Sequence, residues 1–239
     1  MARLSGLILL GMMTGCAIST RDARDPLENW NRGVQSFNDS LDEYVGKPVA
    51  TGYQWVMPSF ADRGVTNFFS NINDIGVTIN DLLQLKLSQA GMDGSRFIVN
   101  TLAGIGGFID VATMIDLPKH EEDFDQTLGV WGVPTGPYLV LPFIGPSSPR
   151  GLGGLIGDTA MNPVSYLDSG IISGSLFAVN WTDFRADNLG TEKAADEAAL
   201  DRYEFFKNAY LQRRHYLVHD GEVPDEEPYL EINEEPGSR

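Results

Sequence analysis

Apolar residues between positions 63 and 86 recur at intervals of three and four, which is typical of one face of an α-helix. A second stripe with the same period carries polar side chains almost free of formal charge, namely Asn67, Asn71, Asp74, Thr78 and Asp81. An ordinary solvent-facing stripe would carry Lys and Glu, so this one favours a helix with one side against lipid or core and the other against a wet cavity. An asparagine-rich surface helix fits this segment equally well.

Two more helices are predicted, over residues 95–113 and 191–218. The first contains three glycines, Gly104, Gly106 and Gly107. A glycine loop that cradles phosphate follows a strand, and no strand pattern precedes these glycines, so they do not indicate a nucleotide site. Small residues at Ala103 and Gly107 are expected instead to permit close helix packing. The second helix carries acids in its first turns, bases near its end, and Gly221 as a stop signal.

The stretch from residue 128 to 157 is apolar but cannot form one long helix. It contains five prolines and eight glycines, and Arg150 is its only charged residue. Two arrangements are allowed: a buried loop with short strand-like pieces, such as residues 138–141, or a re-entrant segment shielded by neighbouring helices. The composition slightly favours the core of a soluble protein.

The start of the chain has the features of a lipoprotein export signal. Arg3 precedes an apolar run that is too short to span a bilayer, and the small pair Thr14 and Gly15 precedes Cys16, the only cysteine. We therefore expect residues 1–15 to be a signal peptide, Cys16 to carry lipid, and residues 16–26 to be a tether. The alternative is an ordinary secretory signal with an incidental cysteine. Ala17 favours the outer membrane as the destination.

Charge limits the partners and the chemistry of the chain. From Cys16 onward it has 33 acidic residues against 16 Lys and Arg, a formal charge of −17, which excludes nucleic acid as a natural partner. Residues 222–239 are expected to be an acidic, disordered tail. About 200 residues remain for one domain.

No catalytic or metal-binding constellation is visible. His215 and His219 lie four apart, but a third ligand is missing, so we interpret them as dipole-stabilising residues at a helix C-terminus. No Gly-x-Ser-x-Gly motif occurs, and lipidation would remove the only thiol. We therefore expect a protein that is not an enzyme and uses no metal or cofactor.

Several motifs resemble those of the MlaA (VacJ) family of outer-membrane lipoproteins, which take part in phospholipid transport and lipid asymmetry. The resemblance spans nearly the whole mature chain. It is carried by DPLE at residues 25–28, RFIVNT at 96–101, GGFID at 106–110, QTLGVWGV at 126–133, GPYLVLP at 136–142, GPSSPR at 145–150 and YLQRR at 210–214. The run from 126 to 150 is the most specific part.

The resemblance implies a mainly helical, ring-like bundle over residues 27–221, embedded in the outer membrane and facing the periplasm. A central amphipathic channel would pass mislocalised outer-leaflet phospholipid toward the periplasm, beside a trimeric porin and onward to a soluble, MlaC-like lipid carrier. On this basis Asn67, Asn71 and Thr78 become candidate channel contacts. Two other functions stay open: a scaffolding lipoprotein that binds porins without moving lipid, and a lipid hydrolase.

Two further sites are proposed from the sequence. Arg150 is a candidate phosphate contact because it is the only cation in its apolar stretch. The alternative, which we favour, is that it caps carbonyl groups or pairs with Asp158. Gly46 and Pro48, which precede the first long helix, are a candidate hinge that could gate the channel.

Overall fold

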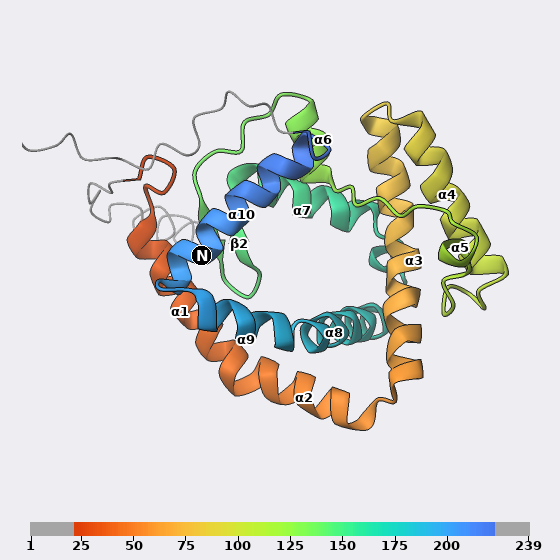
Figure 1. The fold of residues 1–239 in the computed structure, drawn as a ribbon, viewed down its shortest axis with the longest axis horizontal. Helices are drawn as coiled ribbons and strands as arrows, with labels where there is room; N and C mark the ends of the chain where they lie inside the picture. Colours follow the sequence, from red (N-terminus) through yellow and green to blue (C-terminus); the bar gives the residue numbers. More distant parts are fainter. Residues whose placement is uncertain (1–21, 223–239) are drawn as a thin grey trace, which may run out of the picture.

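The computed structural model describes residues 22–222, which are mainly helical and follow one another around a ring (Figure 1). Helices α3, α7, α8, α9 and α10 surround the central opening in this view, and α1 and α2 lie along one side of it. The short strands β1 and β2 pair antiparallel, with Val140 opposite Pro146. The elements are α1 Glu28–Leu41, the π-helical turn η1 Asp42–Gly46, α2 Lys47–Val56, α3 Ser59–Leu83, α4 Leu87–Leu102, α5 Val111–Met114, α6 Phe124–Val130, β1 Leu139–Leu141, β2 Gly145–Ser147, α7 Pro149–Met161, the 3₁₀ turn η2 Pro163–Tyr166, α8 Gly170–Asp187, α9 Leu189–Ala198 and α10 Arg202–Val218.

The first and last parts of the described chain meet and close the ring. Tyr203 at the start of α10 donates a hydrogen bond to the buried carboxylate of Asp25, and Arg32 of α1 reaches Asp201 at 3.1 Å. The backbone N–H of Tyr138 donates to the carbonyl of Arg24 at 2.7 Å. Residues 24 and 25, which were expected to belong to the tether, therefore contact the folded body. Cys16, the signal peptide and nearly all of the predicted tail lie outside the described residues.

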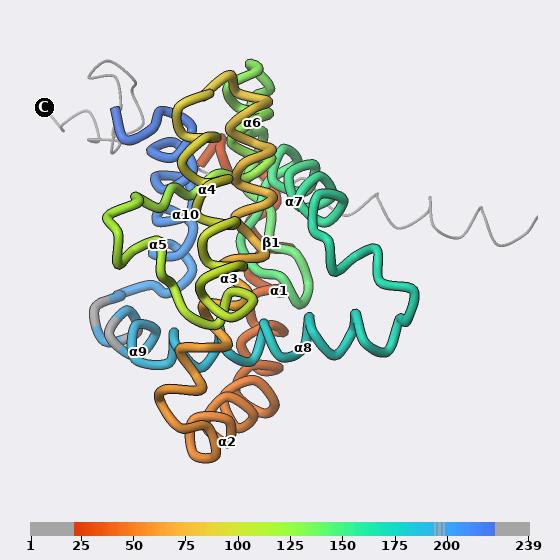
Figure 2. Tube along the Cα trace, turned by 90° about the vertical axis from the view of Figure 1, so that its right-hand side faces the viewer, coloured from red at the N-terminus to blue at the C-terminus, as the bar shows by residue number. Residues whose placement is uncertain are grey.

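The long helix α3 is confirmed, and it packs side by side with α4 as a hairpin (Figure 2). The prediction of a helix over residues 95–113 was wrong at both ends. Helix α4 begins at Leu87 and ends at Leu102, and the glycines then form a turn in which Gly106 and Gly107 have positive φ. A Cβ atom at Gly104 would lie only 2.0 Å from the carbonyl oxygen of Ile109, so the turn itself requires glycine there.

The prediction of one helix over residues 191–218 was also wrong. The chain forms α9 and α10, separated at residues 199–201, where Ala199 has an extended conformation. The side chain of Asp201 accepts hydrogen bonds from the backbone N–H groups of Tyr203 and Glu204, which is an N-cap. A capping signal inside an otherwise periodic segment therefore marked the start of a new helix.

The glycine- and proline-rich middle contains short strands, as expected, and also a helix that the sequence analysis missed. Helix α7 begins at Pro149 directly after Ser148, whose hydroxyl accepts a hydrogen bond from the N–H of Gly151 at 3.0 Å. Proline is favoured in the first helical turn, where its missing N–H has no partner to lose. This start signal outweighs the four glycines in the helix that follows.

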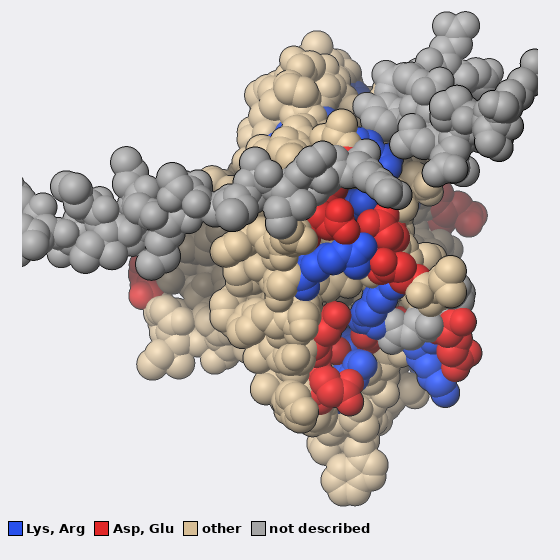
Figure 3. All heavy atoms as spheres, turned by 90° about the vertical axis from the view of Figure 1, so that its left-hand side faces the viewer, with Lys and Arg blue, Asp and Glu red and all other residues tan. Residues whose placement is uncertain are grey.

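The distribution of polar and apolar residues is inverted relative to a water-soluble protein. Eighteen polar or charged residues are buried in the described chain, against ten apolar ones. Large apolar side chains are instead exposed in many places, and Trp55 is 87% exposed. On the face in Figure 3, acids and bases gather in one band over the side of the ring formed by α1, α9 and α10, while most of the remaining surface is uncharged. None of the described helices combines the length and apolar character needed to cross a membrane.

Replacing Asp81 by asparagine is expected to stabilise the protein more at about pH 8 than at about pH 5. Both carboxylate oxygens are buried without a hydrogen-bond partner among the described residues. Burial, together with the charges of Asp93 and Glu122, raises the pKa of Asp81 to about 7, against the lowering effects of His120 and Lys86. A folded-state pKa above the unfolded value makes the ionised acid increasingly destabilising as pH rises between the two values.

The gain in stability from Asp81→Asn should therefore be larger at the higher pH by about 2 kcal/mol. Thermal unfolding of the detergent-solubilised protein at both pH values measures it. Asp168→Asn is the matched control because this acid is exposed, and it should leave the stability of the protein unchanged at both pH values. An equal gain at both pH values would show that the Asp81 carboxyl does not titrate between them.

Candidate functional site

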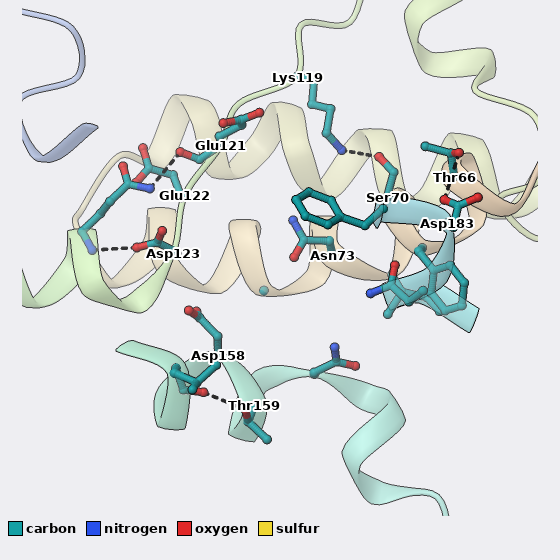
Figure 4. Close-up of a pocket in the computed structure, with 18 of the residues that line it drawn as sticks. Thr66, Ser70, Asn73, Lys119, Glu121, Glu122, Asp123, Asp158, Thr159 and Asp183 are labelled. Carbon is teal, nitrogen blue, oxygen red and sulfur yellow. Dashed lines mark hydrogen bonds between the residues drawn. The ribbon is translucent and has the colours of Figure 1, made fainter. Parts of the chain in front are cut away.

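A cavity of about 590 Å³ lies within the ring and is walled by five parts of the chain (Figure 4). These parts are the four helices α3, α7, α8 and α10 and, in addition, residues 119–126, which lead into and begin α6. Each wall therefore comes from a different region of the sequence. The polar lining residues include Thr66, Ser70, Asn73, Lys119, Glu121, Glu122, Asp123, Asp158, Thr159, Asp183, Asp187, Arg213 and Arg214, and the apolar ones include Phe69, Ile72, Leu155, Phe177, Phe184 and Leu217.

The lining is amphipathic, which suits a ligand with both a charged and an apolar part. Aromatic and aliphatic side chains from α3, α7, α8 and α10 alternate with the charged groups, so no wall is purely polar. Ligand cavities of this volume are common, and placed polar groups within apolar walls are their usual means of orienting a ligand.

The charged residues nearest α6 largely neutralise one another. Glu121 forms an ion pair with Arg213 at 3.1 Å, and Asp123 forms one with Arg214. Glu122 pairs with Lys86 at 2.7 Å. Asp123 is also the N-cap of α6, because its carboxylate accepts from the N–H of Gln126 at 2.8 Å. The acids at this end of the cavity therefore already have cationic partners within the protein.

Asp158 and Asp183, on α7 and α8, form no ion pair among residues 22–222, although the more distant charge of Arg214 lowers the pKa of Asp158. Asp158 accepts hydrogen bonds from the N–H of Phe124 at 2.9 Å and from Asn80. Burial raises its pKa to about 6. Asp183 accepts from the Tyr53 hydroxyl at 2.8 Å and from Thr66 at 3.1 Å, and burial raises its pKa as well. Both acids occupy sites where a positively charged group would be favourable.

The residues predicted to line a channel on α3 lie on a different side of that helix. Asn71 is buried and donates to the Thr101 hydroxyl of α4 at 3.0 Å, and Asn67 donates to the carbonyl of Phe108 at 3.2 Å. Thr78 lies next to Gly94 of α4, where an added Cβ atom would be 3.5 Å from its methyl group. None of the three is among the lining residues of this cavity, and their role as channel contacts stays a prediction. The polar stripe is buried because it forms the interface between α3 and α4.

Arg150 does not reach the cavity either. Its Nε donates to the buried carboxylate of Asp125 at 2.8 Å, and its Nη1 donates to the carbonyl of Val133 at 3.3 Å. The alternative of a structural cation is therefore the one observed, with Asp125 as its partner in place of Asp158. A guanidinium in a buried ion pair is not available to a phosphate.

The polar residues of α3 that line the cavity were not predicted from the sequence. Thr66, Ser70 and Asn73 recur at four and three, which is itself a helical stripe, but it lies between the apolar face and the polar stripe that were recognised in this helix. Lys119 was also missed because it lies in an irregular segment and no local pattern marks it. Its Nζ donates to Ser70 at 2.5 Å and to Asp74 at 2.7 Å.

The proposed hinge lies inside a continuous helical run from Glu28 to Val56. Gly46 is the last residue of the π-helical turn η1, and Pro48 is in the first turn of α2. A Cβ atom at Gly46 would lie 2.3 Å from the Asp42 carboxylate and 3.3 Å from the ring of Trp181, so α8 packs closely against this point. The π-helical geometry is a local irregularity of the kind found at functional positions, and motion at this point stays a prediction.

A second cavity of about 460 Å³ lies between η1, the turn that joins β1 to β2, α8 and α9. Phe184 lines both cavities. The rings of His215 and His219 lie next to each other, with centroids 4.5 Å apart and planes tilted by 42°. No group of three or more metal-ligating side chains in the described ranges has an arrangement suited to a metal ion.

Comparison with known proteins gives consistent matches over most of the chain. A sequence model described as MlaA lipoprotein matches residues 23–217. The "Intermembrane phospholipid transport system lipoprotein MlaA" of Escherichia coli (strain K12) is 36% identical over 95% of this chain and 93% of its own length. The protein of the same name from Haemophilus influenzae is 32% identical over 95% and 94%.

A solved structure is also similar. It comes from work on the "Structural basis for maintenance of bacterial outer membrane lipid asymmetry". The TM-score is 0.72 at 34% sequence identity, with 81% of this chain and 98% of that chain covered. An uncharacterised protein of Rickettsia felis is 37% identical over 81% of this chain and 78% of its own length.

Proposed function

The chain belongs to the MlaA lipoprotein family, and from this we propose that it is a non-enzymatic phospholipid conduit of the outer membrane. It removes mislocalised phospholipid from the outer leaflet and passes it to a soluble periplasmic carrier, which maintains lipid asymmetry. The observation that carries the proposal is an amphipathic cavity inside a ring whose outer surface is rich in exposed apolar side chains.

The inverted distribution of residues supports placement of the ring in a membrane. Exposed side chains such as Trp55, Leu102 and Ile171 are unfavourable in water, whereas contact with lipid tails costs them nothing. The buried cations Arg96 and Arg150 have carboxylate partners within the protein, as charged groups at membrane depth require. Lipid on Cys16 would then direct the protein to the membrane and aid its insertion, while the body provides further attachment.

Two partners follow from the proposed function. The band of charges along α1, α9 and α10 is the part of the surface suited to water, so we place the periplasm and the MlaC-like carrier on that side. A trimeric porin is proposed to contact the apolar outer surface of the ring. The hinge at Gly46 and Pro48 is proposed to let α1 and α2 move relative to one another during transfer.

The lipid content of the purified protein tests the function. We expect the full-length lipoprotein, extracted from membranes in mild detergent, to retain about one intact phospholipid per chain, because the cavity is in the usual size range for a bound small molecule. Mass spectrometry of the extracted lipid measures this. An empty protein would support the scaffold, and formation of lysophospholipid during incubation would support a hydrolase. Either result would overturn the conduit.

A further inference from the structure

Two residues of α3 that line the cavity, about one helical turn apart, bind an acid and a base from other parts of the chain. Thr66 donates to the Asp183 carboxylate at 3.1 Å, and Ser70 accepts from the Lys119 ammonium at 2.5 Å. Thr66 and Ser70 are four residues apart in sequence, so they are neighbours on one face of the helix, with Cβ atoms about 6 Å apart. Figure 4 shows the two pairs side by side along α3. Asp183 and Lys119 thus present opposite charges to the same cavity.

The positive member of this pair can still bind a ligand. Lys119 donates two hydrogen bonds, to Ser70 and to the buried Asp74, and an ammonium group has three N–H donors. Its side chain is 34% exposed, and it lines the cavity. The exposed amide of Asn73, one turn beyond Ser70, lines the same wall and can donate to the same ligand oxygen atoms. A phosphate group placed here would meet both donors.

The negative member lacks a counter-ion. No Lys, Arg or His side chain in the described part of the chain forms an ion pair with Asp183, and its charged neighbours Asp62 and Asp187 are also acids. Burial raises the pKa of Asp183, and the charge of Asp62 raises it further. A carboxylate in this setting is stabilised by a cation that is brought into the cavity. The two hydroxyl donors from Tyr53 and Thr66 hold it in place without neutralising it.

We propose that Lys119 and Asp183 select phospholipids whose headgroup carries a phosphate followed by a primary ammonium group. The phosphate would bind at Lys119 and Asn73, and the ammonium would bind at Asp183. The inference rests on the proposed function, because it assigns a headgroup to the lipid that the cavity conducts. Phe69, Ile72 and Phe177 line the same cavity, which favours a lipid over a free amine.

A glycerol headgroup makes a weaker match to this wall. It has the same phosphate but ends in neutral hydroxyl groups, so it leaves Asp183 without a counter-ion. Its net negative charge is also unfavourable beside Asp62 and Asp187. A hydrogen bond between charged partners is about twice as strong as one between neutral groups. The ammonium headgroup therefore gains the equivalent of one additional ordinary hydrogen bond, which corresponds to a preference of about fivefold.

Competition binding with two variants tests this assignment. Full-length protein in detergent is incubated with equal amounts of phosphatidylethanolamine and phosphatidylglycerol, and the bound lipid is quantified by mass spectrometry. Wild type should hold about five times more of the ethanolamine lipid. Asp183→Asn should bring this ratio close to one. Lys119→Gln should lower the binding of both lipids and leave the ratio unchanged, because both lipids contain the phosphate.

Controls separate selectivity from folding and from the conduit itself. Asp168→Asn removes an exposed acid that does not line the cavity, and it should bind as wild type does. If Asp183→Asn melts at a lower temperature than wild type, N-acetylated phosphatidylethanolamine replaces the variant, because it lacks the ammonium charge and should bind wild type no better than the glycerol lipid.

The outcomes distinguish the two proposals. A wild-type protein that binds no phospholipid overturns the conduit. A protein that binds both lipids equally, or one in which Asp183→Asn or headgroup acetylation leaves the fivefold preference in place, overturns the headgroup assignment and leaves the conduit standing. Binding of free ethanolamine as tightly as of the lipid would show an amine site unrelated to transport.

Discussion

A phenylalanine in place of Gly76 is expected to reduce phospholipid transfer about tenfold or more without unfolding the protein. Gly76 lines the cavity from α3, and an added Cβ atom there would meet no atom within 4 Å. A larger side chain therefore projects into open space that a lipid would need. Forcing a molecule past such a group costs about 1–3 kcal/mol, the usual penalty of overpacking, which corresponds to a factor of about ten in rate.

The rate at which labelled phospholipid leaves proteoliposomes for a soluble acceptor measures this effect. Gly91→Phe is the matched control, because Gly91 lies on α4, lines neither cavity, and also has no neighbour within 4 Å of an added Cβ atom. Both substitutions replace a helical glycine and should raise helix stability slightly. Equal transfer rates for the two variants would mean that lipid does not pass through this cavity.

Replacement of Arg96 by methionine is expected to destabilise the protein by about 3–5 kcal/mol, the usual cost of breaking a buried ion pair. Arg96 is only 1% exposed and joins α4 to the turn that follows it. Its Nη2 donates to both oxygens of Asp110 at 3.0 and 2.9 Å, and its Nη1 donates to the carbonyl of Leu117 at 2.6 Å. Methionine fills similar space but removes the counter-ion of Asp110, which keeps only its uncharged donors Asn100 and Thr113, and leaves the Leu117 carbonyl without its donor.

The melting temperature should fall by about 10 °C in a chain of this size. Arg63→Met provides the control, because Arg63 is exposed and donates one hydrogen bond to a carbonyl of its own helix. The double variant Arg96→Met with Asp110→Asn should recover part of the loss, since it removes the unpaired charge as well. If Arg96→Met and the Arg63→Met control have the same melting temperature, the buried network does not stabilise the α3–α4 hairpin.

Periodicity was sufficient to predict helix α3 but not its environment. The stripe of Asn71, Asp74 and Thr78 was correctly placed on one face of α3, and the question left open was what that face contacts. In the structure it meets α4, whose own polar residues Arg96 and Asn100 were visible in the sequence. In a soluble protein two polar stripes would both face water. Here they face each other, because the apolar stripes are the ones that remain exposed.

The helix boundaries that were predicted wrongly are set by single residues, which interrupt a longer periodic pattern. Ser148 and Pro149 start a helix in a glycine-rich run, Asp201 starts another in a continuous amphipathic segment, and Gly104 ends α4 because a carbonyl oxygen occupies the space of a side chain. Capping motifs of this kind can be found in a sequence. The close approach at Gly104 cannot, because Ile109 reaches it only after the chain has turned.

The candidate site could be predicted only in part for a similar reason. The resemblance of the sequence to a lipid-transport family indicated an amphipathic channel, and a cavity of that character is present. Its cation, Lys119, lies in an irregular segment, and its acid, Asp183, lies in a helix with no strong amphipathic pattern. Their relation to Thr66 and Ser70 depends on how α8 and residues 115–123 approach α3, which local sequence does not specify.

The closure of the ring between its first and last helices determines when the cavity can exist during biosynthesis. Asp25 and Arg32 emerge early, but Tyr203 and Asp201, which they contact, are among the last structured residues to be made. A chain that ends before α10 therefore lacks these contacts and leaves the ring open, so the cavity gains its last wall only when α10 is in place.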